Sequence, residues 1–171
     1  MKMNYKVAAV ALASLFSVSA LAVQKDITVV ADIDTTIELL QADGSALPQT
    51  LRLTYLPGVG LRSENIRTKI FTNDPDQKVQ VRLLSEPQLL GVTNPAAAAI
   101  PLSVSFNGAP LSTTVTNIEP TALYPTGVTD NGSVQMDLTI GQKTLGAVTR
   151  SGSYQGVVSL VLNTAAATPT P

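Results

Sequence analysis

The sequence contains no cysteine, no histidine and no tryptophan, and aromatic residues make up only 4 % of it. Without cysteine no disulfide can brace the chain, so its stability must come from a packed core or from assembly. Without histidine it can form neither a Ser-His-Asp nor a Cys-His catalytic arrangement, and no zinc or iron site that uses imidazole. The lack of tryptophan removes the largest aromatic surface for stacking on sugars.

Charge is scarce and balanced, with 11 Lys and Arg residues against 12 Asp and Glu residues. The basic side chains are scattered singly along the chain rather than clustered. This distribution argues against nucleic acid and against an anionic membrane surface as partners.

The chain begins like an exported protein. A basic start precedes an apolar run at residues 7–16, which is too short to span a bilayer, and Ala20-Leu21-Ala22 supplies the small-residue pattern of a signal-peptidase site. We therefore expect a mature chain that starts at Val23; the alternative is a buried N-terminal helix. No long apolar run follows, so the sequence predicts no transmembrane helix.

Strand patterns recur along the rest of the chain, and no long helical period competes with them. The clearest strand candidates are residues 37–40, 50–56, 66–72, 78–84, 101–106, 133–140 and 154–163. The segments 66–72 and 78–84 flank an Asn-Asp-Pro-Asp turn and indicate a hairpin, and Asn107-Gly108 is a strong tight-turn dipeptide. The pattern predicts an all-β fold, an antiparallel β-sandwich of immunoglobulin-like type, with an up-and-down barrel as the alternative.

The best candidates for acid–base chemistry are Asp32 and Asp34, which share one face of a predicted strand. Two carboxylates in this position could serve a glycosidase or help to hold calcium. The other face of the same strand is apolar, however, which is the ordinary pattern of a half-solvated strand. Gly152–Gly156 lacks the spacing of a serine nucleophile elbow. The sequence therefore predicts no enzyme, no metal and no cofactor.

The two ends of the mature chain are its most distinctive parts. One face of the last predicted strand is more hydrophobic than the other; it is formed by Tyr154, Gly156, Val158, Leu160 and Leu162. No strand pattern follows it, so its far edge needs a partner. The segment at residues 26–34 alternates equally clearly and has no obvious neighbour, and its apolar face consists of Ile27, Val29, Ala31 and Ile33. The C-terminal strand therefore needs a partner strand, and the N-terminal strand pattern has no predicted neighbour.

These same stretches resemble a known family. Residues 23–48, VQKDITVVADIDTTIELLQADGSALP, closely resemble the mature N-terminus of the major pilins of colonisation factor antigen I and its relatives. That group is the alpha class of chaperone-usher fimbriae, which also includes the cable pili. Residues 152–162, GSYQGVVSLVL, resemble the C-terminal strand of the same pilins, and residues 71–83 resemble part of their middle.

The resemblance implies an incomplete immunoglobulin-like β-sandwich that a donor strand from a neighbouring subunit completes. In these pilins a periplasmic chaperone first fills the groove beside the C-terminal strand. At the outer-membrane usher, the N-terminal extension of the next subunit replaces the chaperone. Carried over to this chain, the donor side chains would be Ile27, Val29, Ala31 and Ile33. The acceptor groove, which also binds the chaperone, would be lined by Tyr154, Gly156, Val158, Leu160 and Leu162.

The expected organisation is thus a signal peptide at 1–22, a donor extension at 23–35, an immunoglobulin-like pilin domain at 36–163 and a loose tail at 164–171. Thr35 stands where relatives carry a proline. The expected function is that of a major structural subunit of an adhesive surface fimbria, exported through the periplasm. Its partners would be identical subunits, the chaperone, the usher, a tip adhesin and host-cell or mucin glycans. The alternative is a monomeric exported sandwich that binds carbohydrate or protein.

Overall fold

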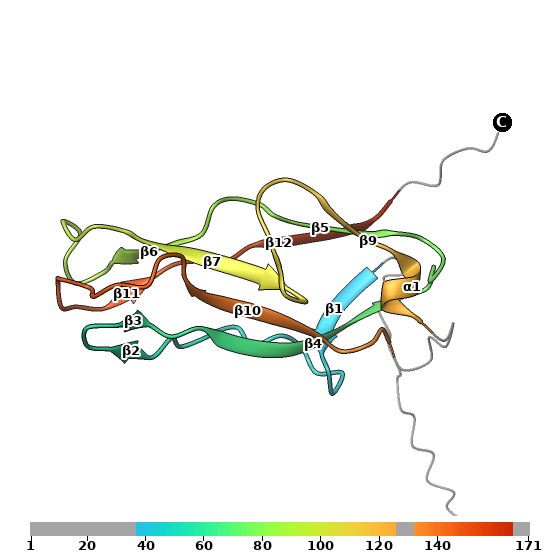
Figure 1. The fold of residues 1–171 in the computed structure, drawn as a ribbon, viewed down its shortest axis with the longest axis horizontal. Coiled ribbons are helices and arrows are strands. Elements are labelled where there is room, and N and C mark those ends of the chain that lie inside the picture. The colour runs from blue at the N-terminus through green and yellow to red at the C-terminus, as the bar shows by residue number, and fades with distance from the viewer. Residues whose placement is uncertain (1–36, 126–131, 166–171) are drawn as a thin grey trace, which may run out of the picture. The chain divides into compact units, whose positions relative to one another are not determined.

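The computed structural model describes residues 37–125 and 132–165, which form β-strands and one short helix (Figure 1). In chain order the elements are β1 (Ile37–Gln41), β2 (Tyr55–Leu56), β3 (Gly60–Leu61), β4 (Glu64–Thr72), β5 (Val79–Leu83), β6 (Gln88–Gly91), β7 (Ile100–Phe106), β8 (Ala109–Pro110), β9 (Thr116–Ile118), α1 (Pro120–Leu123), β10 (Met136–Gln142), β11 (Tyr154–Gln155) and β12 (Leu160–Thr164). The predicted signal peptide, the donor extension and most of the predicted tail lie outside the described residues.

The strands form two main sheets. The larger, seven-stranded sheet has the order β1-β4-β10-β7-β6-β11, with β8 also paired to β7, and the smaller sheet has the order β12-β5-β9. Strands β2 and β3 form a separate small hairpin. Every ladder among the described strands is antiparallel. The predicted antiparallel sandwich is confirmed.

The core lies between the two sheets, because strands of both sheets alternate between a buried and a more exposed face. In β7, and in β10 as far as Ile140, the buried positions are every second residue, as the sequence predicts, and β5 from the smaller sheet supplies the opposing face. The core residues contributed by these three strands are Val79, Val81, Leu83, Leu102, Val104, Phe106, Met136, Leu138 and Ile140.

The hairpin predicted for residues 66–72 and 78–84 is wrong. β4 pairs with β1 and β10 in the larger sheet, whereas β5 pairs with β12 and β9 in the smaller sheet. The turn between them therefore carries the chain across the core from one sheet to the other. Each strand has one buried, mainly apolar face, and packing these faces against one core from opposite sheets covers both of them. The turn dipeptide at Asn107-Gly108 does form a tight hairpin, with positive φ angles of 50° and 78°.

Two predicted strands are shorter in the structure. In the segment 50–56 only Tyr55 and Leu56 pair, with β3, although Leu51 and Leu53 pack against the core. The predicted strand at 154–163 is divided into β11, which pairs with β6, and β12, which pairs with β5. Gly156 lies at the division, where a Cβ atom would collide with the carbonyl oxygen of Gln88.

Polar contacts close one end of the core around the backbone of Ile70. The Ser133 amide donates to the Ile70 carbonyl (2.8 Å), and the Ile70 amide donates to Ser133 Oγ (2.9 Å). The Tyr124 hydroxyl also donates to the Ile70 carbonyl (3.1 Å), and burial raises the pKa of Tyr124. Near the other end Gly141 packs against Ser63, whose Cα would lie 3.0 Å from an added Cβ. These contacts hold β4 and β10 in register.

Candidate functional site

The most unusual feature of the sandwich is a pair of neighbouring open edges. Among the described strands, β1 is the edge strand of the larger sheet and pairs with β4 alone, and β12 is the edge strand of the smaller sheet and pairs with β5 alone. β1 and β12 approach each other, yet within the described residues no ladder joins them. No other described strand pairs with the backbone groups along these two edges, and unpaired edges are a situation that β-sheet proteins usually avoid.

Core-facing side chains along these two edges are less buried than those of the strands beside them. Leu39, Leu160 and Leu162 point toward the core but are only half-buried. Their cross-strand partners Ile70, Leu83 and Val81 are 0 %, 1 % and 1 % exposed, respectively. On both edges, therefore, the core-facing side chains of the edge strand are less buried than their partners on the next strand. We call this feature the edge groove and define it by Ile37, Leu39, Val158, Leu160 and Leu162, which pack against the core cluster.

The structure places the sequence-predicted groove residues in two groups. Val158, Leu160 and Leu162 lie on the core side of the chain at or just before β12. Tyr154 and Gly156 do not belong to β12, because the chain crosses between sheets after β11. The predicted donor residues Ile27, Val29, Ala31 and Ile33 lie outside the described residues, as do Asp32 and Asp34. The roles of all these residues remain predictions.

Sequence reasoning did not assign the opposite wall of the groove. Ile37 and Leu39 form it, on β1, at two alternating apolar positions that follow soon after the predicted donor segment. The alternation could have shown that this short strand has a core-facing side. Only the ladder to β4 shows that the strand stands at an edge facing β12.

The turn after β1 is held by Asp43, whose pKa is lowered because the Ser45 hydroxyl and amide donate to its carboxylate.

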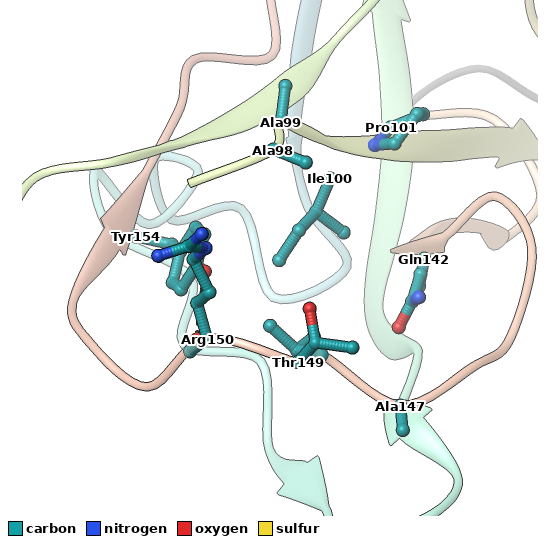
Figure 2. A pocket seen from close by; sticks show the side chains of 10 residues that line it. Ala98, Ala99, Ile100, Pro101, Gln142, Ala147, Thr149, Arg150 and Tyr154 are labelled. Atoms are coloured by element: carbon teal, nitrogen blue, oxygen red, sulfur yellow. Dashed lines mark hydrogen bonds between the residues drawn. The ribbon is translucent and has the colours of Figure 1, made fainter. Parts of the chain in front are cut away.

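A separate hollow of about 230 Å³ opens between the start of β7, the end of β10 and the segment before β11 (Figure 2). Tyr154 lies here, and its hydroxyl donates to the Arg150 carbonyl (2.9 Å). The hollow is lined by Ala98, Ala99, Ile100, Pro101, Gln142, Ala147, Val148, Thr149, Arg150 and Tyr154. None of these is a carboxylate, so the lining offers no acid–base pair of the kind that hydrolysis requires.

Two further features of the described residues bear on function. No group of three or more carboxylates within this part of the chain is arranged to hold a metal ion. No helix in the same residues is long and apolar enough to cross a membrane. The candidate functional site is the edge groove, because its apolar floor lies between two rows of backbone groups that no described strand pairs.

The sequence profile of the CS1 type fimbrial major subunit family matches residues 23–163. The chain belongs to this family. It is 42 % identical over 167 residues to a CFA/I fimbrial subunit of Escherichia coli O78:H11, covering 95 % of this chain and 98 % of that protein. It is 44 % identical over 171 residues to a CS1 fimbrial subunit of Escherichia coli, with the same coverage of 95 % and 98 %.

Solved structures support the same assignment. The CooA pilin subunit of enterotoxigenic Escherichia coli is similar, with a TM-score of 0.67 and 37 % identity over 77 % of this chain and 88 % of that one. A structure described as a chaperone-tip adhesin complex of CFA/I fimbriae shares the fold alone, with a TM-score of 0.55 and 13 % identity over 76 % of this chain and 42 % of that one. The chain is thus a structural subunit of a cell-surface fimbrium, exported through the periplasm, and its incomplete sandwich is the pilin fold.

Proposed function

We propose that the edge groove of one subunit binds the N-terminal segment of the next and that this contact builds the fimbria. The observation that carries the proposal is the paired loss of burial at β1 and β12, each one strand away from fully buried partners. An added strand between these edges would cover the half-buried side chains and pair with the backbone on both sides. This is β-strand addition in its donor-strand form.

The N-terminal segment of the same chain type has the chemistry of such a strand. Its apolar face, consisting of Ile27, Val29, Ala31 and Ile33, matches the apolar floor of the groove, and its other face is mostly polar and would meet water. Burying an aliphatic side chain of this size contributes about 1.5–3 kcal/mol. The donor belongs to one subunit and the groove to another, so the contact is head-to-tail and propagates a filament.

Assembly partners follow from the same chemistry. A subunit with an uncovered core would aggregate before it met the next subunit, so the groove needs a temporary occupant in the periplasm. We assign this role to a periplasmic chaperone, with exchange at an outer-membrane usher and a tip adhesin at the head of the filament. The relatives are named as fimbrial subunits, which supports assembly with other subunits into a fimbria. The subunit's role is structural, without catalysis.

The deciding experiment compares two rearrangements of the mature chain. One removes residues 23–34, and the other, the rearranged chain, carries the same residues behind Ala165 through a short turn. We expect the shortened chain to aggregate or to melt at low temperature and the rearranged chain to be a stable monomer. A shortened chain that is a stable monomer would show that the sandwich is already complete and would favour a monomeric binding module.

A matched pair of substitutions tests the donor face in the natural chain. Val29→Asp places a charge on the face that enters the groove, and we expect it to abolish fibres, because an unpaired buried charge is strongly unfavourable. Thr28→Asp adds the same charge to the opposite face of the same strand and should leave assembly intact. Fibres of normal length from the Val29→Asp subunit, seen by electron microscopy, would contradict the proposal.

A further inference from the structure

The two ends of β4 lead to different surfaces of the domain. At its first residue, Glu64, β4 follows the β2-β3 hairpin. The segment after β10 packs closely against this hairpin: a Cβ atom added to Gly60 would collide with the carbonyl oxygen of Gly146. At its last residue, Thr72, β4 lies opposite Ile37, where β1 begins. The nine residues of β4, at about 3.4 Å each, separate these two regions by roughly 27 Å.

The surface at each end of β4 consists of two chain segments. The first surface, which we call the hairpin end, consists of residues 55–62 and 143–150. The second surface, which we call the turn end, consists of residues 73–78 and 119–125. The two segments of the turn end lie together, because Lys78 forms an ion pair with Glu119 and β5 pairs with β9 beside them. Figure 1 shows the β2-β3 hairpin and α1 at opposite ends of β4.

The hairpin end exposes a group of large apolar side chains. Each of them is between 37 % and 62 % exposed: Tyr55, Leu56, Val59 and Leu145. The two segments that carry them meet at Gly60 and Gly146, so the four residues belong to one region of the surface. Next to the turn end, Val134 is 40 % exposed and lies beside α1, because its amide donates to the Leu123 carbonyl (2.9 Å). Single exposed apolar residues are ordinary, whereas a group on adjoining segments indicates a contact surface.

The two ends also differ in charge. Each end has one lysine that is neutralised by an ion pair: Lys143 with Glu86 (3.6 Å) at the hairpin end, and Lys78 with Glu119 (3.0 Å) at the turn end. The remaining exposed charges of the hairpin end are those of Arg62 and Arg150, with the half-buried Glu64 beside them. The remaining exposed charges of the turn end are those of Asp74 and Asp76. The hairpin end is therefore net positive and the turn end net negative.

The place where β1 begins decides which neighbour each end can meet. The predicted donor segment joins the domain at Ile37, which lies opposite Thr72 and thus beside the turn end. If this segment lies in the groove of another subunit, the turn end faces that subunit. A subunit inside a filament has two neighbours, and one end cannot hold both of them. Two turn ends would also bring Asp74 and Asp76 of each subunit together, and these like charges would repel.

We propose that the hairpin end of each subunit receives the turn end of the next subunit, with Arg62 and Arg150 facing Asp74 and Asp76 around the apolar side chains of the hairpin. The inference rests on the proposed function and adds a second contact to the donor strand. An apolar centre with a charged rim is the usual anatomy of a protein interface. Opposite charges at the rim fix the orientation of the partners, and a contact between two different ends continues along the filament.

The first experiment is chemical crosslinking of assembled fibres, because the chain contains no cysteine and introduced thiols therefore react alone. Full-length subunits with Val59→Cys and Asn73→Cys carry one exposed thiol at the hairpin end and one at the turn end. A short bis-maleimide should join successive subunits and give a ladder of covalent multimers on a denaturing gel. In the matched control Val59→Cys is combined with Ser103→Cys, which is exposed on the outer face of β7, and no ladder should form.

Two results would overturn the proposed contact. One is a set of intact fibres of the Val59→Cys, Asn73→Cys subunit that give no more multimers than the control. The other is efficient dimer formation in fibres that carry Asn73→Cys alone, because it would place one turn end against another. If Val59→Cys prevents assembly, Leu145→Cys takes its place, since Leu145 is exposed on the adjoining segment of the same end.

The second experiment reverses the charges and measures the rate of fibre dissociation in urea. We expect Arg62→Glu fibres and Asp74→Lys fibres to dissociate about three- to tenfold faster than natural fibres at low salt, which is the range for lost surface ion pairs with added repulsion. The double variant should return to within about threefold of the natural rate. At about 1 M NaCl, where the Debye length is about 3 Å, the differences should shrink. Unchanged rates, or a double variant as fast as the single variants, would contradict the charge pairing.

The Val29→Asp subunit separates failure of this contact from failure of the proposed function. If Val29→Asp blocks assembly while the Val59→Cys, Asn73→Cys fibres give no ladder, the contact between the ends falls and the donor strand stands. If Val29→Asp subunits assemble normally, the donor strand itself falls.

Discussion

Two leucines on neighbouring strands allow the cover that the donor strand provides to be measured, as a difference in the free energy of unfolding that is lost when each leucine is replaced by alanine. Leu83 on β5 and Leu160 on β12 are direct cross-strand partners on the core side of the smaller sheet. Leu83 is 1 % exposed, whereas Leu160 is only half-buried because nothing among the described residues covers it from the groove side. They are the same residue type in the same sheet and differ chiefly in this cover.

The expected magnitudes follow from burial. Replacing a fully buried leucine with alanine costs about 2–5 kcal/mol, so Leu83→Ala should cost this amount whether or not a donor is present. Removing a half-buried leucine should cost about half as much, roughly 1–2 kcal/mol, without the donor. With the donor in place Leu160 becomes a core residue, and the cost of Leu160→Ala should rise to within about 1 kcal/mol of that of Leu83→Ala.

Urea unfolding of the rearranged chain and of the chain without residues 23–34 gives these free energies from the transition midpoint and slope. If the shortened chain shows no cooperative transition, the two leucine variants are compared in the rearranged chain alone. A cost for Leu160→Ala of less than half that of Leu83→Ala in the rearranged chain would refute the reasoning. It would mean that residues 23–34 do not cover β12.

Three further outcomes are expected from the scaffold that holds the groove. Ser133→Ala should lower the free energy of unfolding by about 1–3 kcal/mol in urea titrations of the rearranged chain, because it leaves a buried β4 amide without its acceptor; an unchanged midpoint would contradict this. Gly141→Ala should lower the melting temperature, because the added Cβ would collide with a neighbouring serine. Gly146→Ala should leave it unchanged, because no atom lies within 4 Å of the added Cβ, and equal effects of the two substitutions in calorimetry would contradict this packing. Burial raises the pKa of Tyr124 above its ordinary value of 10.0, so the stability that its protonated hydroxyl contributes is fully present below about pH 10 and is lost as the pH rises through the folded-state pKa. Tyr124→Phe should therefore flatten the alkaline decline of the melting temperature, and an identical decline in both proteins would contradict this reasoning.

The β-rich class and the inward faces of several strands could be predicted because alternation is a local property. Met136, Leu138 and Ile140 alternate in the sequence and alternate in burial. The turn at Asn107-Gly108 was equally predictable, because its positive φ angles depend on those two residues themselves. In each case the physical cause lies within a few residues of the pattern that reveals it.

Pairing could not be predicted in the same way. The turn after β4 could have closed a hairpin or carried the chain across the core, and only the burial of both inner faces against one common core decides for the crossing. Likewise, the apolar run that ends in β12 gave no sign that the chain would change sheets at Gly156. The carbonyl of Gln88, distant in sequence, occupies the space that a side chain would need there.

The β class of this fimbrial protein, the apolar faces of its strands, its resemblance to the pilins and the additional strand pattern at residues 26–34 can all be read from the sequence. The folded chain is needed to show which of the described strands lie at sheet edges and that β1 lies beside β12. The reason is that an edge is defined by the strand that is missing beside it. That absence depends on contacts between residues far apart in the chain, whereas a strand's apolar face depends only on its own alternation.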